Sequence, residues 1–384
     1  MLKPVTSLYV HVPFCASKCS YCAFYSHAPD GETVNRYVDA LVREMEMVAD
    51  DLEPTTIFFG GGTPSILNLR QWERVLQVMN RLELTGGGEW TVECNPATLS
   101  LEKAKLLRDG GVNRISMGVQ SLNADLLDRL GRVHSRAMVF KSYDNLRAAG
   151  FERINLDLMF AIPSQTIEVW LASLRETVEL EPEHLSCYEV IYEQDTPLYE
   201  QLQAGEFDVQ EDLACDMFEA LTEFAGEHGF HQYEVANFAR HTGAPEFEIP
   251  SEACRHNVIY WRGGDYYGLG PSATGYVRGV RTTNIANTQA YCESLEIGER
   301  AISHEEELTS LKRAGETAAF GLRMNAGWPF AEFQRMTGFD LRDEWGEEME
   351  RLMEQGNAII EANRFRLTPQ GLRFADAAAS SFLR

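Results

Sequence analysis

The stretch SLYVHVPFCASKCSYCAF, Ser7–Phe24, joins a predicted strand to a loop that carries three cysteines. Its first eight residues are rich in apolar and aromatic side chains, which favours a strand. Cys15, Cys19 and Cys22 follow directly, and Phe24 stands two residues after the third cysteine. Reactive side chains at the carboxyl end of a strand are typical of barrels and open α/β sheets. The stretch therefore predicts an α/β fold with a site on this loop.

Short apolar runs and amphipathic helical stretches alternate over residues 1–231. The strands expected after the first are Thr55–Gly61, Glu89–Pro96, Arg114–Ser121, Ile154–Phe160 and Leu185–Tyr192, and the helices expected between strands are Arg36–Asp51, Leu69–Leu82, Leu101–Asp109 and Thr166–Leu180. Parallel strands need helix-length connections, so this alternation predicts a parallel sheet. Six strand–helix units are too few to close an eight-stranded barrel. We therefore expect a partial (β/α)6 TIM-like barrel over residues 1–231.

The pattern changes after the predicted barrel. Residues 232–303 are rich in glycine and aromatic residues and are expected to form a strand-and-loop region that carries the motif HNVIYW. Residues 304–384 begin with a polar helical segment and end in a pattern of helix, two short strands and helix over Leu352–Asp376. This pattern predicts a helical, winged-helix-like C-terminal domain.

Composition and charge exclude several classes of protein. At 44% hydrophobic residues the chain of 384 residues can bury a core, and its net charge of −24 disfavours binding to nucleic acid, which is itself a polyanion. No apolar run reaches the roughly 20 residues of a membrane helix, and the amino-terminal residues lack the apolar centre of a signal peptide. Eight cysteines, three of them clustered, are typical of a metal or redox site in a reducing compartment. We therefore expect a cytoplasmic protein without a transmembrane segment or a nucleic-acid partner.

The spacing C-x3-C-x2-C of the cysteine loop narrows the choice of metal. Thiolates are soft ligands that suit zinc and iron–sulfur clusters. Structural zinc takes four ligands, typically in paired C-x2-C elements, and the sequence has no second pair. A cubane cluster held by three thiolates leaves one iron open to another ligand. Incidental cysteines are the alternative, but three in this spacing directly after a strand favour a cluster.

The spacing, with Tyr21 before the last cysteine, resembles the radical S-adenosylmethionine superfamily. The segments YVHVPFC, GGGTPS, ECNP, SMGVQS and DLMFAIPSQT resemble one branch of it, the oxygen-independent coproporphyrinogen dehydrogenases and their relatives. This resemblance covers most of the chain. It implies that Cys15, Cys19 and Cys22 hold a 4Fe-4S cluster, whose open iron takes the amine and carboxylate of S-adenosylmethionine.

A cofactor pocket is expected beside the cluster. The run Gly60–Ser65 lets a ligand approach the backbone closely and lacks the lysine of a phosphate-binding loop. Carboxylates near strand ends can accept hydrogen bonds from ribose hydroxyls, and an arginine can pair with a carboxylate. The resemblance implies cofactor contacts for Tyr9, Tyr21, Phe24, Gly61, Gly62, Thr63, Glu93, Gln120, Arg132 and Asp157. Taken singly, each of these could instead be a surface charge or a structural residue.

Three features separate the chain from the coproporphyrinogen dehydrogenases. Those enzymes carry a fourth cysteine where this sequence has Phe24, and a longer segment before the first cysteine. The motif H-N-x-x-Y-W at His256–Trp261 resembles the signature of the HemW-type haem chaperones, which bind haem and pass it to an acceptor. A neutral imidazole is a common axial ligand of haem iron, so His256 is the expected ligand and Cys254 a second candidate. A histidine that caps a turn beside core aromatics is the structural alternative.

The leading hypothesis is a haem chaperone with a 4Fe-4S cluster, S-adenosylmethionine and haem as cofactors and a haem-accepting protein as partner. The second is an oxygen-independent coproporphyrinogen III dehydrogenase, in which a 5′-deoxyadenosyl radical starts the loss of carbon dioxide from propionate side chains. A radical enzyme that modifies transfer RNA comes third, since the sequence has no basic, aromatic-rich stripe. No catalytic residue is assigned, and the identity of the acceptor, the second axial ligand and a homodimer stay open.

Overall fold

The computed structural model describes residues 3–85 and 87–384. Within it the chain forms two compact units. The barrel unit comprises the chain up to Leu221 with Tyr266–Val277 and Thr282–Glu305, and the C-terminal unit comprises Thr222–Asp265, Arg278–Arg281 and Glu306–Arg384. Residues 232–303, expected as one region, therefore contribute to both units.

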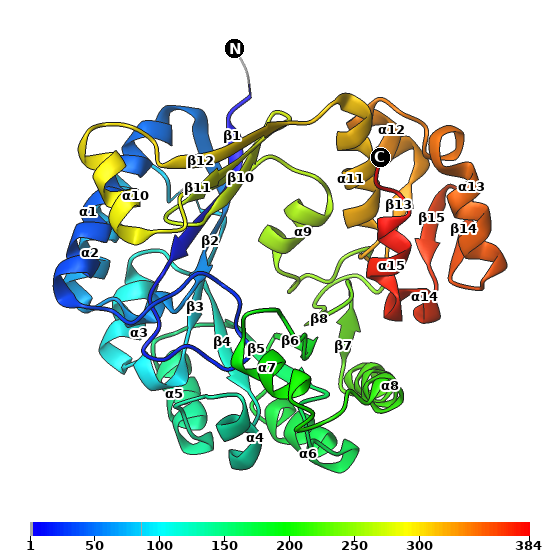
Figure 1. The fold of residues 1–384 in the computed structure, drawn as a ribbon, viewed down its shortest axis with the longest axis horizontal. Coiled ribbons are helices and arrows are strands. Elements are labelled where there is room, and N and C mark those ends of the chain that lie inside the picture. Colours follow the sequence, from blue (N-terminus) through cyan, green and yellow to red (C-terminus); the bar gives the residue numbers. More distant parts are fainter. Residues whose placement is uncertain (1–2, 86) are drawn as a thin grey trace. The chain divides into compact units, whose positions relative to one another are not determined.

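A parallel sheet is the framework of the barrel unit (Figure 1). Its strands are β1 (Val5–Val12), β2 (Leu52–Gly61), β3 (Glu89–Cys94), β4 (Arg114–Gln120), β5 (Arg153–Phe160), β6 (His184–Glu189) and β9 (Tyr267–Leu269). They lie in the order β6-β5-β4-β3-β2-β1-β9, and each neighbouring pair is parallel. All six expected strands are confirmed, and the row of strands is the partial barrel that the sequence predicts. The short strand β9 was not expected beside β1.

Helices connect these strands and begin at polar residues. They are α1 (Gly31–Val48), α2 (Leu69–Arg81), α3 (Leu101–Asp109), α4 (Ala124–Arg129), α5 (Arg136–Ala148), α6 (Ile167–Val178), α7 (Pro197–Gln203) and α8 (Glu211–Glu227), with short 3-10 turns at Ala49–Asp51, Pro64–Ile66 and Pro96–Thr98. The side chains of Asp30, Asn68, Ser100 and Thr166 accept hydrogen bonds from the first turns of α1, α2, α3 and α6, the four expected helices. Within the described ranges, no helix has the length and apolar character of a membrane span.

The two faces of the barrel strands carry different side chains. One face is apolar and packs against helices: Phe59 of β2 contacts Trp72 of α2, and Phe160 of β5 contacts Trp170 of α6. The opposite face carries the polar residues Ser7, Thr56, Thr91, Glu93, Ser116, Asn155, Asp157 and Ser186. A TIM barrel normally fills its interior with branched apolar side chains. The polar interior of this partial barrel indicates a binding site.

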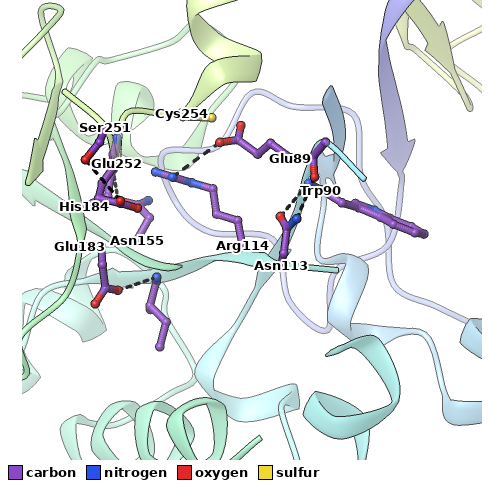
Figure 2. Close-up of polar contacts among 12 residues, drawn as sticks. Glu89, Trp90, Asn113, Arg114, Asn155, Glu183, His184, Ser251, Glu252 and Cys254 are labelled. Atoms are coloured by element: carbon purple, nitrogen blue, oxygen red, sulfur yellow. Dashed lines mark hydrogen bonds and ion pairs between the residues drawn. The ribbon is translucent and has the colours of Figure 1, made fainter. Parts of the chain in front are cut away.

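A buried polar network lies at the amino ends of β3 to β6 on the same polar face (Figure 2). Arg114 Nη1 lies 3.7 Å from Glu89 Oε2, and both side chains are buried. His184 Nδ1 lies 2.6 Å from Asn155 Oδ1. Burial holds the pKa of His184 well below its usual value, so the neutral ring donates this hydrogen bond. The network lies at the amino ends of the strands, whereas the cysteine loop follows the carboxyl end of β1. Residues at the amino ends of barrel strands usually stabilise the fold and do not bind the cofactor.

The C-terminal unit has its own core. It contains α11 (Ser310–Gly321), β13 (Trp328–Pro329), α12 (Phe330–Thr337), α13 (Leu341–Glu354), β14 (Ala358–Glu361), β15 (Arg364–Leu367), α14 (Pro369–Arg373) and α15 (Ala375–Ser380), and also the antiparallel hairpin of β7 (Phe230–Gln232) and β8 (Asn237–Arg240). β13, β15 and β14 form an antiparallel sheet. Trp328 and Phe365 of this sheet belong to the same hydrophobic core as Phe333 of α12 and Trp345 of α13. The expected helix, two strands and helix are confirmed as α13, β14, β15 and α14.

The expectation of strands and loops around the HNVIYW motif is wrong. Residues Arg255–Trp261 form a helix, α9, and a second helix, α10, spans Thr288–Glu296. The short strands β8, β9, β10 (Thr274–Val277) and β11 (Val280–Asn284) and the start of β12 (Ile302–Glu307) fit the expectation. Val258, Ile259 and the aromatic residues of α9 have strand propensity, and tertiary packing overrides propensity in so short a segment.

Candidate functional site

The three cysteines lie on a loop that is closed at its base by two backbone hydrogen bonds. His27 N donates to Pro13 O, and Cys15 N donates to His27 O, both at 3.0 Å. All three thiols are free and half-buried. The loop is therefore closed at its base by a parallel bridge between Phe14 and His27, and its half-buried thiols are open to a ligand.

The middle of the loop is held by two helices. Ser20 N donates to Leu130 O at the end of α4, and Leu198 N at the start of α7 donates to Ser20 O. Tyr21 packs against an apolar cluster that includes Leu130, Met159 and Leu198. Tyr21, expected as a cofactor contact, thus anchors the loop to the barrel unit.

Two side chains from other elements reach the thiols. Thr63 Oγ1 lies 3.5 Å from Cys15 Sγ, and Arg132 Nη1 donates to Cys19 Sγ at 3.3 Å. The second terminal nitrogen of Arg132 donates to Gly118 O at 2.6 Å, which fixes the guanidinium. The fixed guanidinium therefore holds the sulfur of Cys19 in position within the loop.

This donor set fits a 4Fe-4S cluster. Within the described residues no three His, Cys, Asp or Glu side chains converge closely enough to hold a single metal ion. A cubane cluster places each thiolate on a different iron, so its ligands need not converge on one point. Three free thiols on one closed loop meet that requirement, whereas structural zinc needs four convergent ligands.

The glycine run lies against the end of β1. Gly62 N donates to Val12 O at 2.9 Å, and Thr63 N donates to Phe14 O at 2.8 Å. Gly61 has φ +95°, and a Cβ built there would lie 2.3 Å from His11 Nδ1. The turn therefore needs glycine for its backbone conformation and for its approach to His11.

A Gly61→Ala variant should be destabilised by both effects. Gly150 has a similar φ of +87°, but a Cβ there meets nothing within 4 Å, so Gly150→Ala is a matched control for backbone strain alone. We expect Gly61→Ala to lose more unfolding free energy than Gly150→Ala, by roughly 1–3 kcal/mol. Urea denaturation of both variants measures the difference, and equal losses would contradict the close approach to His11.

Two carboxylates face the polar interior from β3 and β5. Glu93 Oε2 accepts from Gly61 N at 3.2 Å, and Asp157 accepts from Asn155 Nδ2 at 2.6 Å and from Ser116 Oγ. Desolvation, and next the charge of Asp157, raise the pKa of Glu93 to about 8. Desolvation also raises the pKa of Asp157. Glu93 and Asp157 are thus two carboxyl groups buried away from solvent. Their oxygens can accept hydrogen bonds from hydroxyl and amine groups of a ligand.

His11 is a site residue that sequence reasoning missed. His11 Nε2 lies 2.8 Å from Tyr25 O, so this nitrogen carries the hydrogen, and Nδ1 then accepts from Tyr9 Oη at 3.0 Å. Burial lowers the pKa of His11, which keeps the ring neutral. The signal was the alternation of Tyr9 and His11 along β1, which puts both on the polar face.

Most of the expected cofactor residues lie at the carboxyl ends of the barrel strands. Gln120, which has a positive φ of 64°, ends β4, and its amide and the Arg132 guanidinium flank Gly118. Those brought to this end of the sheet are Tyr9, Gly61, Gly62, Thr63, Glu93, Gln120, Arg132 and Asp157. Phe24 differs, because it is 68% exposed.

The expected haem ligand lies in the other unit. His256, near the start of α9, is fully buried, and its Nε2 lies 2.7 Å from Tyr260 Oη. Burial lowers the pKa of His256 to about 3, so its imidazole is neutral. Cys254, the second candidate, is also buried, and its backbone N donates to Tyr233 Oη.

The chain matches two family models and several full-length proteins. The family model of the Radical SAM superfamily matches residues 9–176, and that of the HemN C-terminal domain matches residues 308–374. The chain is 34% identical to the Heme chaperone HemW of Lactococcus lactis over 100% of this chain and 98% of that protein. The chain belongs to the HemW family. It is also 34% identical to the HemW of Bacillus subtilis, over 98% and 99% of the two chains, and 32% identical to that of Escherichia coli, over 99% and 98%.

A solved structure shares the HemW fold. The coproporphyrinogen III oxidase (HemN) of Escherichia coli, described as a radical SAM enzyme, superposes with a TM-score of 0.84 over 99% of this chain and 90% of its own. The two chains are 22% identical, so this likeness concerns the fold alone. It confirms the α/β partial barrel with its C-terminal domain.

Proposed function

We propose that this HemW-family protein is a haem chaperone, which binds haem and passes it to an acceptor protein. The observation that carries the proposal is the similarity to proteins named Heme chaperone HemW, at 34% identity over 98% or more of both chains. Phe24 agrees with it, because an exposed apolar side chain stands where the decarboxylating relatives carry a further cysteine. The haem acceptor is a protein whose identity the chain's own residues do not specify.

The cysteine loop would hold a 4Fe-4S cluster through Cys15, Cys19 and Cys22. When bound, this cluster supplies an electron and an iron with an open position for S-adenosylmethionine. Thr63 and Arg132 orient the thiolates through the contacts to Cys15 and Cys19.

The polar interior beside this loop would hold S-adenosylmethionine. Glu93 and Asp157 accept hydrogen bonds from its hydroxyl and amine groups, and the glycine turn lets the ligand approach the backbone. Tyr9 is held by its hydrogen bond to His11, which fixes its ring at the edge of the same pocket.

Haem iron would be ligated by His256. Iron binds a neutral imidazole, and burial lowers the pKa of His256 to about 3, which favours that form at physiological pH. Nε2 lies in hydrogen-bond contact with the Tyr260 hydroxyl, which would have to move aside for iron to bind there. Haem would therefore compete with this hydrogen bond.

A haem titration followed by the Soret band tests this proposal. We expect saturable binding of roughly one haem per chain, as one axial histidine implies, and a lost or shifted band in His256→Ala. His134→Ala is the matched control, because His134 is also buried and its Nε2 contacts a backbone oxygen, that of Val119. Tyr260→Phe, which removes the competing hydroxyl, should bind haem at least as tightly as the unaltered chain.

The outcomes separate the hypotheses. An identical Soret band in His256→Ala would remove this residue from the role of iron ligand. The same protein, with cluster, S-adenosylmethionine and reductant, should not convert coproporphyrinogen III to protoporphyrinogen. Conversion together with unspecific haem binding would favour the dehydrogenase instead.

A further inference from the structure

One residue outside the region that matches the Radical SAM family contacts two side chains of the cysteine loop. The match covers residues 9–176, whereas Thr288 is the first residue of α10. Its side chain is buried and lies against Tyr25 and His27, which follow the third cysteine. We propose that Thr288 is a positioning residue that keeps the cysteine loop closed around its cluster. This inference rests on the proposed cluster, because only a bound cluster gives the closed loop a function.

The hydrogen bonds between these residues form one consistent chain. Thr288 N donates to Tyr25 Oη at 2.8 Å, so the Tyr25 hydroxyl is free to donate to Thr288 Oγ1 at 3.2 Å. His27 Nδ1 lies 3.1 Å from Ala28 O and therefore carries the hydrogen, which leaves Nε2 to accept from Thr288 Oγ1 at 2.8 Å. Each donor thus has its acceptor, so the contact selects a single geometry.

His27 closes the loop with its backbone. It donates to Pro13 O and accepts from Cys15 N, and all three cysteines lie between these ends. Its ring also contacts Phe14, with the centroids 5.1 Å apart. A displacement of His27 would open the base of the loop, beside the first thiol. Thr288 fixes the side chain of the residue on which that closure depends.

The helix α10 is itself fixed to the barrel unit by a buried carboxylate. Glu44 of α1 is fully buried and accepts from Tyr291 Oη of α10 at 2.6 Å. It also accepts from Gly270 N and Asn284 Nδ2, both at 2.8 Å. A carboxylate with three such donors gives a rigid junction.

The other end of α10 is tied to the same helix. Arg36 of α1 pairs through two nitrogens with Glu296 of α10, at 2.5 and 2.7 Å. α10 is thus attached near both ends to α1, which itself starts shortly after the cysteine loop. Thr288 can therefore act as a fixed point for that loop.

The test compares two threonine-to-valine variants of the full chain. Thr288→Val removes the hydroxyl and keeps the backbone N–H, and Thr288→Ser restores the hydroxyl. Thr283→Val is the matched control, since the Thr283 hydroxyl, in β11, lies 3.3 Å from the hydroxyl of Thr274 and not against the cysteine loop. Each variant is reconstituted anaerobically, and the loss of its cluster absorbance is followed after addition of an iron chelator.

We expect Thr288→Val to lose its cluster at least about tenfold faster than Thr283→Val, because it loses the two hydrogen bonds of the Thr288 hydroxyl, to Tyr25 and to His27, and each is worth up to about a factor of ten. Thr288→Ser should return to the rate of the unaltered chain. Without cluster, the thiols of Thr288→Val should also react faster with an alkylating reagent, measured by mass spectrometry of the peptide that carries Cys15 to Cys22.

Equal rates for Thr288→Val and Thr283→Val would overturn the inference, as would a serine variant that does not restore the rate. If Thr288→Val does not fold, Tyr25→Phe removes the two hydrogen bonds between Tyr25 and Thr288, keeps the bond to His27, and should also accelerate cluster loss, though by a smaller factor. Failure of the unaltered chain to take up any cluster would instead refute the proposed cluster itself. The alkylation rates would then still report whether Thr288 closes the loop.

Discussion

A Cys19→Ser variant, reconstituted anaerobically with iron and sulfide, should retain almost none of the 4Fe-4S absorbance of the unaltered chain. Serine is a poor ligand for this cluster, and two thiolates on one loop leave two irons without a protein ligand. Cys19 also accepts from Arg132, so the substitution removes the sulfur that this guanidinium orients. Cys15→Ser and Cys22→Ser should behave in the same way, because each of these cysteines would ligate one iron of the cluster.

Cys215→Ser is the control for this experiment. Cys215 is a free, half-buried cysteine like the three on the loop, but it lies on α8. The iron and sulfide content and the cluster spectrum of Cys215→Ser should match those of the unaltered chain. A Cys19→Ser variant that keeps a full cluster, or a Cys215→Ser variant that loses it, would contradict the assignment of the loop.

Replacing Arg114 by methionine should cost the barrel unit roughly 3–5 kcal/mol of unfolding free energy, as removal of one partner from a buried ion pair does. The guanidinium lies 3.7 Å from the carboxylate of Glu89, and both side chains are buried (Figure 2). Methionine fills much of the volume but leaves the buried carboxylate without this counter-charge. Urea denaturation followed by tryptophan fluorescence measures the change.

Two further variants isolate the charge effect. Arg136→Met breaks the ion pair between Arg136 and Glu176, in which both side chains are substantially exposed. It should change the free energy of unfolding far less than Arg114→Met does. Adding Glu89→Gln to Arg114→Met removes the uncompensated charge and should recover part of the loss. A loss in Arg114→Met no larger than that in Arg136→Met would mean that the buried pair does not stabilise the barrel.

Much of the barrel could be predicted from local pattern. β1 to β6 are runs of apolar and β-branched residues bounded by polar caps, and α1, α2, α3 and α6 have apolar faces at helical spacing, so each element is visible in its own residues. The cysteine loop was equally visible, because three thiols in one spacing are rare outside metal sites. Glu93 and Asp157 were found as carboxylates near strand ends.

Other features depend on contacts between distant residues. β9 has three residues, too few for a pattern, and is a strand because it pairs with β1. α9 has the composition of a strand and is nevertheless a helix. No spacing in the sequence indicates that Thr288 lies against Tyr25 and His27, since more than 260 residues separate it from them.

The sequence by itself determined the order of β1 to β6 with α1, α2, α3 and α6, and the polar face of these strands, because both follow from the period of side chains along each element. It also determined the thiols of the loop, through the spacing of their cysteines. Only the tertiary structure decided which side chains hold that loop. His11, Arg132 and Thr288 reach it from a neighbouring strand, from the residues after α4 and from α10. Hydrogen bonds act over about 3 Å, so which residues become partners depends on how the elements pack. The local pattern of side chains in the sequence does not show these partners.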